Sequence, residues 1–378
     1  MIARALFFFL TLAAACYSNS SNFTPSPDDL FCFGKMWSHL GEYQEEQKLY
    51  AAIAERRAEV HALKLHWKWR LDACQEGTDR DFYQKIHQIL ETGTLKRLED
   101  GSGAAHLLND ETGTPRFILK PLDGEILCLN NTKCYGNPLN EVRFRARPHI
   151  PLYHSVQTDA LVYACASRLG ISSIAPKTVM DIIASDVFYD LSERLEGTTQ
   201  EEFFLIAGSA DRERLCSVQE YIPHSQEFTA WYRVALSQGF SHEHIAGVIS
   251  QEDFENIHLL IWIIYDNDAH PANIRVIEQE DGHVRLMKVD NTLSFPEKNT
   301  HLLNTLSLLP NAHEKLSLRG QELVASLPVD TIVDLLEHYE MEYAVTAFLE
   351  RVRVLQELAQ RDLTLREIDE CMEHLERK

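Results

Sequence analysis

The sequence is poor in basic residues, in closely paired cysteines and in long apolar runs. It has 36 Lys and Arg against 57 Asp and Glu, a formal net charge of −21 over 378 residues. This balance argues against nucleic-acid binding and against non-specific attachment to an anionic membrane. The eight cysteines include no Cys-x-x-Cys pair, which disfavours a zinc site. There is no internal repeat or low-complexity tract, so we expect one large or two smaller globular domains.

The N-terminus has the pattern of an export signal. Arg4 precedes the apolar run ALFFFLTLAAA at residues 5–15, and Cys16 follows it. The run is shorter than the roughly 20 apolar residues that cross a bilayer, and small residues stand before a plausible cleavage point. The pattern predicts export, with lipidation of Cys16 or a buried first helix as alternatives. Residues 17–30 are polar and contain proline, which is typical of a linker.

A helical lead follows the linker. Residues 45–75 carry apolar side chains at near-helical spacing with Lys and Arg between them, which predicts a long amphipathic helix. We expect this helix to pack against the body of the protein, and we expect a shorter helix near residues 81–97. The predicted organisation is a signal-like segment at 1–16, a linker at 17–30 and a helical N-terminal region at 31–97.

From about residue 98 the pattern changes to short apolar runs between turns rich in Gly and Asp. AAHLL (104–108), RFILKP (116–121) and CSVQEYI (216–222) predict strands of a small β-rich lobe. Residues 155–169 return to helical spacing before Gly170.

The rest is predicted to be mostly helical, including residues 329–358. Thr364 and Glu367 form a capping box for a last helix. The fold class predicted from this order is α+β.

Two features of the small lobe suit phosphate chemistry. The turn that contains Gly101, Ser102 and Gly103 lacks bulky side chains, so its backbone N–H groups can approach a phosphate. Lys120 stands alone in the apolar strand FILKP, where burial without a partner would be costly. Nucleotide phosphates or a carboxylate on a helix would offset that cost.

Polar residues also cluster after the apolar run FENIHLLIWIIY. Asp268 and Asn273 are five residues apart with Pro271 between them, so they lie in a loop, and LMKVDN (286–291) predicts a strand that ends at Asp290. Phosphoryl transfer needs a carboxylate that orients the attacking hydroxyl and accepts its proton. It also needs oxygen ligands for magnesium. Asp268 suits the first task, and Asn273 and Asp290 suit the second.

Taken together, these pieces resemble the catalytic domain of the phosphatidylinositol 3-/4-kinase superfamily, with the type II 4-kinases the nearer branch. The matching segments are GSG with FILKP, LGISSIAPKT, SVQEYI, DNDAHPAN, VDNTLSFP and LLPNAHEKLS, in this order over about residues 95–360. The resemblance implies a bilobal protein-kinase-like fold in residues 98–378. Its N-lobe would cover about 98–222 and its C-lobe about 223–378.

Carried over by position, the resemblance assigns a role to each residue. Lys120 would pair with the α- and β-phosphates, Asp268 would be the catalytic-loop carboxylate, and Asn273 and Asp290 would hold Mg²⁺ or Mn²⁺. His270 would stabilise developing charge on the phosphoryl group or act as a hydrogen-bond partner within the loop. The remaining ATP contacts would come from Gly101, Ser102 and Gly103 over the phosphates and from Gln219, Glu220, Tyr221 and Ile222 against the adenine.

Two positions depart from the family pattern. Ala269 stands where the family often has Arg, which removes a fixed positive charge near the transferred group. The helix Glu that would pair with Lys120 has no clear counterpart: Asp159 falls nearest to its place, and Glu141 is the alternative. These departures keep open an inactive pseudokinase or a nucleotide-binding scaffold.

The sequence leaves the acceptor open. DNDAHPAN also resembles the catalytic loop of HipA-type Ser/Thr kinases, whose acceptor is a protein, whereas LSFP and LLPNAHEKLS favour a lipid kinase. We therefore expect a kinase that uses ATP and Mg²⁺, with a phosphoinositide lipid or a protein as substrate and peripheral membrane contact. Since a kinase needs ATP, an exported chain would act in a host cell or in an ATP-containing lumen, and a secreted effector is the leading hypothesis.

Overall fold

The computed structural model describes residues 58–68, 70–71, 79–98, 105–124, 149–151, 153–185, 213–299, 302 and 304–375. All of them belong to one compact unit, Ile53–Lys378. Several predictions fall outside these ranges: the signal-like segment, the linker, the turn at Gly101, Ser102 and Gly103, and Glu141. Within the described part of the chain, no helix is long and apolar enough to cross a membrane.

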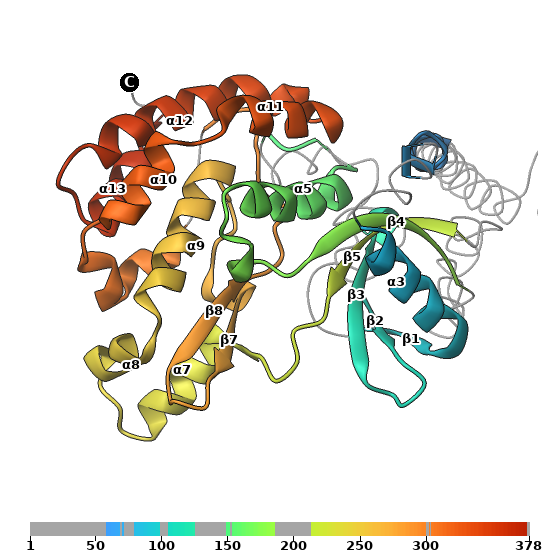
Figure 1. Cartoon of the computed structure of the whole chain (residues 1–378), viewed down its shortest axis with the longest axis horizontal. Helices are drawn as coiled ribbons and strands as arrows, with labels where there is room; N and C mark the ends of the chain where they lie inside the picture. Colours follow the sequence, from blue (N-terminus) through green and yellow to red (C-terminus); the bar gives the residue numbers. More distant parts are fainter. Residues whose placement is uncertain are drawn as a thin grey trace, which may run out of the picture. The chain divides into compact units, whose positions relative to one another are not determined.

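The first lobe is built on a five-stranded antiparallel sheet with strand order β1-β2-β3-β5-β4 (Figure 1). Side chains alternate between its two faces, as the period of a strand requires. One face carries Phe117 and Val179 and packs against helix α3, Arg80–Thr92. The strands are β1 Thr94–Arg97, β2 His106–Asn109, β3 Pro115–Pro121, β4 Thr178–Ala184 and β5 Glu213–Glu220.

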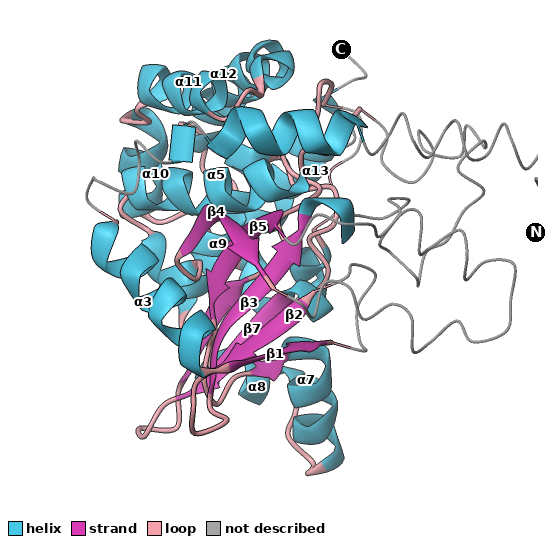
Figure 2. Ribbon diagram, turned by 90° about the vertical axis from the view of Figure 1, so that its right-hand side faces the viewer, coloured by secondary structure: helices cyan, strands magenta, loops and turns pink. Residues whose placement is uncertain are grey.

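The opposite face of this sheet packs against α5, Ser155–Arg168, and against the helical residues of the 58–71 segment. Met180 and Leu215 supply the sheet side of this second cluster. Helix α5 also contacts α11, so it lies between the sheet and the second lobe (Figure 2).

The second lobe is mainly helical around α9 (Gln251–Ile264), which is buried from Asp253 to Ile264 and apolar throughout from Leu259 to Ile264. A helix segment that is apolar on all sides belongs in the centre of a lobe. The surrounding helices are α7 Phe228–Ser237, α8 His242–Val248, α10 Leu318–Ala325, α11 Val329–His338, α12 Val345–Ala359 and α13 Leu365–Glu373. Short 3₁₀ turns occur at Leu122–Gly124, Ser172–Ile174, Pro271–Asn273, Thr305–Leu308, Pro310–His313 and Glu342–Ala344.

A small second sheet, of order β6-β7-β8, lies in this lobe. Its strands are β6 Gln226–Glu227, β7 Ile274–Glu278 and β8 Val284–Lys288. Residues 221–225 run from β5 of the first sheet to β6 of the second, as Figure 1 shows. The N–H of Tyr221 donates to the Arg116 carbonyl at 2.9 Å, which ties the start of this connection to β3.

Most sequence-predicted elements are confirmed, but the boundaries of two predicted helices are wrong. The predicted strands and the helix at 155–169 are present, and Thr364 and Glu367 form the expected capping box. The predicted helical run 329–358 is broken between α11 and α12, where Glu340 has a φ of 59°. Strands β4, β6 and β7 have no counterpart among the predicted strands; β6 and β7 lie in the lobe that was expected to be mostly helical.

The predicted helix at 81–97 ends early, at Thr92, and β1 begins two residues later. Gly93 lies between them because a Cβ there would stand 2.0 Å from the Asn109 carbonyl oxygen and 2.7 Å from that of Ile89. The close approach of β2, which local helical spacing cannot reveal, sets this boundary.

Candidate active site

The β7–β8 hairpin brings the two predicted metal ligands to one end of the small sheet. Ile274 pairs with Lys288, and the N–H of Val289 donates to the Asn273 carbonyl at 2.9 Å. Asn273 directly precedes β7 and Asp290 follows β8 by two residues, so strand pairing alone makes them neighbours. Asp290 has a φ of 54°, a backbone conformation that Asp tolerates better than most residues.

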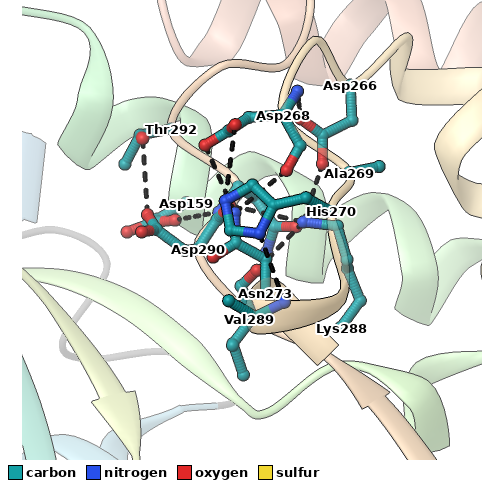
Figure 3. Close-up of polar contacts among 12 residues, drawn as sticks. Asp159, Asp266, Asp268, Ala269, His270, Asn273, Lys288, Val289, Asp290 and Thr292 are labelled. Carbon is teal, nitrogen blue, oxygen red and sulfur yellow. Dashed lines mark hydrogen bonds and ion pairs between the residues drawn. The ribbon is translucent and has the colours of Figure 1, made fainter. Parts of the chain in front are cut away.

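A buried ion pair holds the catalytic loop against this hairpin. The Lys288 ammonium lies 2.7 Å from the Asp266 carboxylate, and both side chains are 0% exposed. The same ammonium donates to the carbonyl oxygens of Val289, at 2.9 Å, and Asp290, at 3.3 Å. Asp266 in turn accepts from the N–H of Asp268 at 2.9 Å. One lysine therefore connects the loop of Asp268 to the loop of Asp290 (Figure 3).

Sequence reasoning missed both members of this pair. The available signal was Lys288 inside the apolar strand LMKV, the same argument that singled out Lys120 in FILKP. A lysine in a buried strand requires a carboxylate nearby. Asp266, two residues before Asp268, was the closest candidate in sequence to the predicted site.

Asp268 is half-buried and directed toward the predicted metal ligand. The Asn273 side-chain N–H group donates to the Asp268 carbonyl at 3.0 Å and to its carboxylate at 3.3 Å. Burial raises the pKa of the Asp268 carboxyl; His270 opposes the rise, and the charges of Asp266 and Asp290 add to it. A carboxylate with a raised pKa is a better proton acceptor than an ordinary aspartate.

His270 makes two contacts, one through each ring nitrogen. Nδ1 accepts from the N–H of Ala272 at 3.2 Å and caps the 3₁₀ turn Pro271–Asn273. Accepting at Nδ1 leaves the proton on Nε2, which lies 3.5 Å from the Asp268 carboxylate. The two roles expected from the sequence are thus compatible: the ring is a structural partner in the loop and also lies beside the Asp268 carboxylate.

Lys120 joins the first sheet to α5 and to the Asp290 loop. Its ammonium lies 3.0 Å from Asp159 and 3.0 Å from Asp290. Asp159 is 2% exposed and also accepts from the Ser217 hydroxyl, at 3.1 Å, and from the Asn291 N–H, at 3.0 Å. Burial lowers the pKa of the Lys120 ammonium, but the two carboxylates outweigh it and raise the pKa above its ordinary value. Of the two partners considered for Lys120, the structure brings Asp159 into contact.

The donor set fits a hard divalent cation. Asn273 and Asp290 offer oxygen atoms, which Mg²⁺ prefers. Four carboxylates (Asp159, Asp266, Asp268 and Asp290) surround two ammonium groups, so negative charge is in excess. In the described ranges, no group of three or more His, Cys, Asp or Glu side chains is placed to hold a metal. Nucleotide oxygens and water would have to complete the coordination, as is usual for Mg²⁺.

The predicted site residues thus fall into three groups. Six come together around the two loops: Lys120, Asp159, Asp268, His270, Asn273 and Asp290. Four lie at the connection between the lobes, with Gln219 buried, Glu220 exposed, and Tyr221 and Ile222 half-buried. The remaining three, Gly101, Ser102 and Gly103, lie outside the described residues.

Replacing Lys288 by Met should expose the cost of the buried pair. Asp266 would remain buried without a counter-ion, so we expect the free energy of unfolding to fall by about 3 to 5 kcal/mol. The double variant Lys288→Met/Asp266→Asn removes the stranded charge and keeps an acceptor for the Asp268 N–H. We expect it to recover at least half of the loss in a denaturant titration, and a double variant less stable than Lys288→Met would contradict the assignment.

Comparisons with known proteins leave the family open. No family model matches the chain, and no curated protein matches its sequence. Among solved structures, the crystal structure of the Golgi casein kinase is similar to this chain with a TM-score of 0.45 and 10% identity, over 76% of this chain and 80% of that one. The chain's own topology, an antiparallel sheet followed by a helical lobe, confirms the predicted α+β, bilobal, kinase-like fold.

Proposed function

We propose that the chain is an ATP- and Mg²⁺-dependent phosphotransferase with an alcohol group as acceptor. The observation that carries this proposal is the position of Lys120, which contacts Asp159 of α5 and Asp290 of the metal loop at 3.0 Å each. A lysine on the third strand, paired with a helix carboxylate beside a metal-binding aspartate, is the arrangement that positions a nucleotide in kinases. The Asp290 carboxylate is half-exposed, which a purely structural ion pair with Lys120 would not require.

The residues divide the work in a defined way. Lys120 would bind the α- and β-phosphates, and Asn273 and Asp290 would hold the metal. Asp268 would orient the acceptor hydroxyl and accept its proton. A bound Mg²⁺ would neutralise charge on the phosphates. Gln219, Glu220, Tyr221 and Ile222 would contact the adenine, because they lie where the chain passes from one lobe to the other.

For the acceptor we propose a phosphoinositide lipid, with a protein Ser/Thr as the alternative. Support for the lipid comes from the sequence resemblance, above all VDNTLSFP and LLPNAHEKLS. Phe295 of LSFP is fully buried and its N–H donates to the Ile264 carbonyl at 2.7 Å, so this motif anchors the end of α9. Support for a protein acceptor comes from the resemblance of DNDAHPAN to the HipA-type catalytic loop. Its Ala269 is 1% exposed and bridges to Asn304, so the Arg that the lipid-kinase family often has there would not fit without rearrangement.

The intact set of Lys120, Asp268, Asn273 and Asp290 argues against a pseudokinase or a scaffold that only binds nucleotide. We further propose that the chain is exported and acts where ATP is present, as a secreted effector would. This second proposal rests on the N-terminal sequence pattern alone.

Phosphate transfer should depend on Asp268. With γ-labelled ATP and Mg²⁺, we expect the chain to label either phosphatidylinositol vesicles or proteins of a cell lysate, offered in parallel. Asp268→Ala should reduce the rate by a factor of about 10² to 10⁴, since it removes the proton acceptor. Label in the lipid fraction supports the phosphoinositide kinase, and label only in protein supports the alternative. Transfer by Asp268→Ala at the wild-type rate would show that Asp268 is not the base.

Asp290 should be required for metal-dependent nucleotide binding. In a thermal shift assay, we expect Mg-ATP to raise the melting temperature of the wild type and to leave that of Asp290→Ala unchanged, because a ligand that binds only the folded state stabilises it. Glu280→Ala, an exposed change at the other end of the β7–β8 hairpin, is the matched control and should behave like the wild type. An equal shift in Asp290→Ala would exclude Asp290 as a metal ligand.

The pH dependence should report the pKa of Asp268. Because burial raises this pKa, we expect the acid limb of kcat/KM to lie above the ordinary aspartate value of about 3.9. His270 lowers the Asp268 pKa, so His270→Asn should move the limb to higher pH while Asn preserves the cap on Ala272. The exposed change His283→Asn is the control. A limb that stays in place or moves to lower pH in His270→Asn would contradict the assignment.

A further inference from the structure

The helical segment within residues 58–71, here called the brace helix, places one large side chain in the interior. Trp67 is 1% exposed and packs in a cluster with residues of α5, β4 and β5. The cluster members are Leu71, Leu122, Tyr153, Val156, Ala160, Met180 and Leu215. An aromatic side chain of this size contributes most of the apolar contact that a short helix can make.

The contact on α5 lies at the turn that carries Asp159. Val156 is three residues before Asp159 and Ala160 is one residue after it. Residues three or four apart share one side of a helix, so Val156 and Ala160 lie on the side of α5 that packs against the brace helix. A shift of this turn would move the Asp159 carboxylate away from Lys120, because the two are joined by a single contact of 3.0 Å.

The brace helix also touches both lobes. Lys68 contacts Glu213 at the start of β5 at 3.1 Å, and Lys64 lies 3.6 Å from the same carboxylate. On the second lobe, Trp67 stacks on Tyr339 with ring centroids 6.4 Å apart, and Arg70 contacts Glu340 at 2.6 Å. The ion pairs are partly solvent-exposed and contribute little, so the buried indole dominates the attachment.

We propose that Trp67 is a positioning residue for phosphate transfer: it holds α5 where Asp159 meets Lys120. The inference rests on the proposed function for its kinetic consequence, but not for its structural one. The brace helix then belongs to the catalytic unit, although the family resemblance does not extend to it. Its role is to keep the Lys120–Asp159 pair formed.

The kinetic test uses the full chain at a temperature where circular dichroism shows every variant to be folded. We expect Trp67→Ala to lower kcat about 10- to 100-fold, the size of effect that a small misplacement of a reacting group produces. Trp67→Phe keeps the apolar contact and should restore most of the rate. Leu65→Ala changes an exposed residue of the same helix, 49% exposed, and should match the wild type.

A double-mutant cycle separates positioning from a general loss of stability. Once Asp159→Asn has removed the carboxylate, moving α5 has nothing further to disturb at Lys120, so Trp67→Ala should add little to the loss. Residues that act through one contact give such non-additive effects, whereas independent sites add. Full additivity of the two changes in kcat would overturn the proposal.

Chemical labelling of Lys120 tests whether Trp67 holds α5 in place, without a measurement of phosphate transfer. The Lys120 amine is labelled with an amine-reactive reagent, and the modified peptide is quantified by mass spectrometry. The Lys120 amine is held in contacts with Asp159 and Asp290 and its side chain is only 22% exposed, so Trp67→Ala should make the amine more accessible and accelerate its labelling, and Trp67→Phe and Leu65→Ala should not. Unchanged Lys120 labelling in Trp67→Ala would overturn the proposal. A wild-type chain that transfers no phosphate would overturn only the proposed function, because the labelling result still decides the position of α5.

Discussion

The buried ion pair between Lys288 and Asp266 is the interaction on which the candidate active site depends. The Lys288 ammonium binds a carboxylate on the catalytic loop and two carbonyl oxygens on the metal loop. Removing two charges from water is costly, and an apolar pair of similar volume would often be as stable. What an apolar pair could not do is bind both loops through directed hydrogen bonds. The pair therefore serves the geometry of Asp268 and Asp290 more than it serves stability.

Lys120 performs the complementary task between the lobes. Lys288 joins the loops of the helical lobe from β8 of the small sheet, whereas Lys120 reaches the Asp290 loop from β3 of the first sheet. Its bond to Asp159 makes the orientation of α5 a condition of the site. Because carboxylates outnumber ammonium groups here, Asp268 experiences repulsion from Asp266 and Asp290, and this adds to the burial that raises its pKa. A cation bound at Asp290 would relieve part of that repulsion, which would couple metal binding electrostatically to the protonation of Asp268.

Through the brace helix, the orientation of α5 also depends on the N-terminal part of the described chain. Helix α5 touches the first sheet on one side, α11 on another, and Trp67 at the turn of Asp159. A helix held on several sides cannot rotate without breaking apolar contacts, and close packing makes such changes discrete and costly. The chemistry thus rests on two polar loops, while their alignment with the first lobe rests on apolar packing.

The sequence by itself determined the chemical types and most of the elements. The spacing of Asp268, Pro271 and Asn273 predicted a loop, Lys120 in FILKP required a counter-charge, and Thr364 with Glu367 predicted a cap that the structure contains. These conclusions needed only local rules of periodicity, burial and capping. Only the tertiary structure decided that Asp159 pairs with Lys120, that Lys288 joins the two loops, and that α3 ends at Gly93 against the Asn109 carbonyl. Each of these depends on a contact between segments distant in sequence, and periodicity shows which face of an element is buried but not what it is buried against.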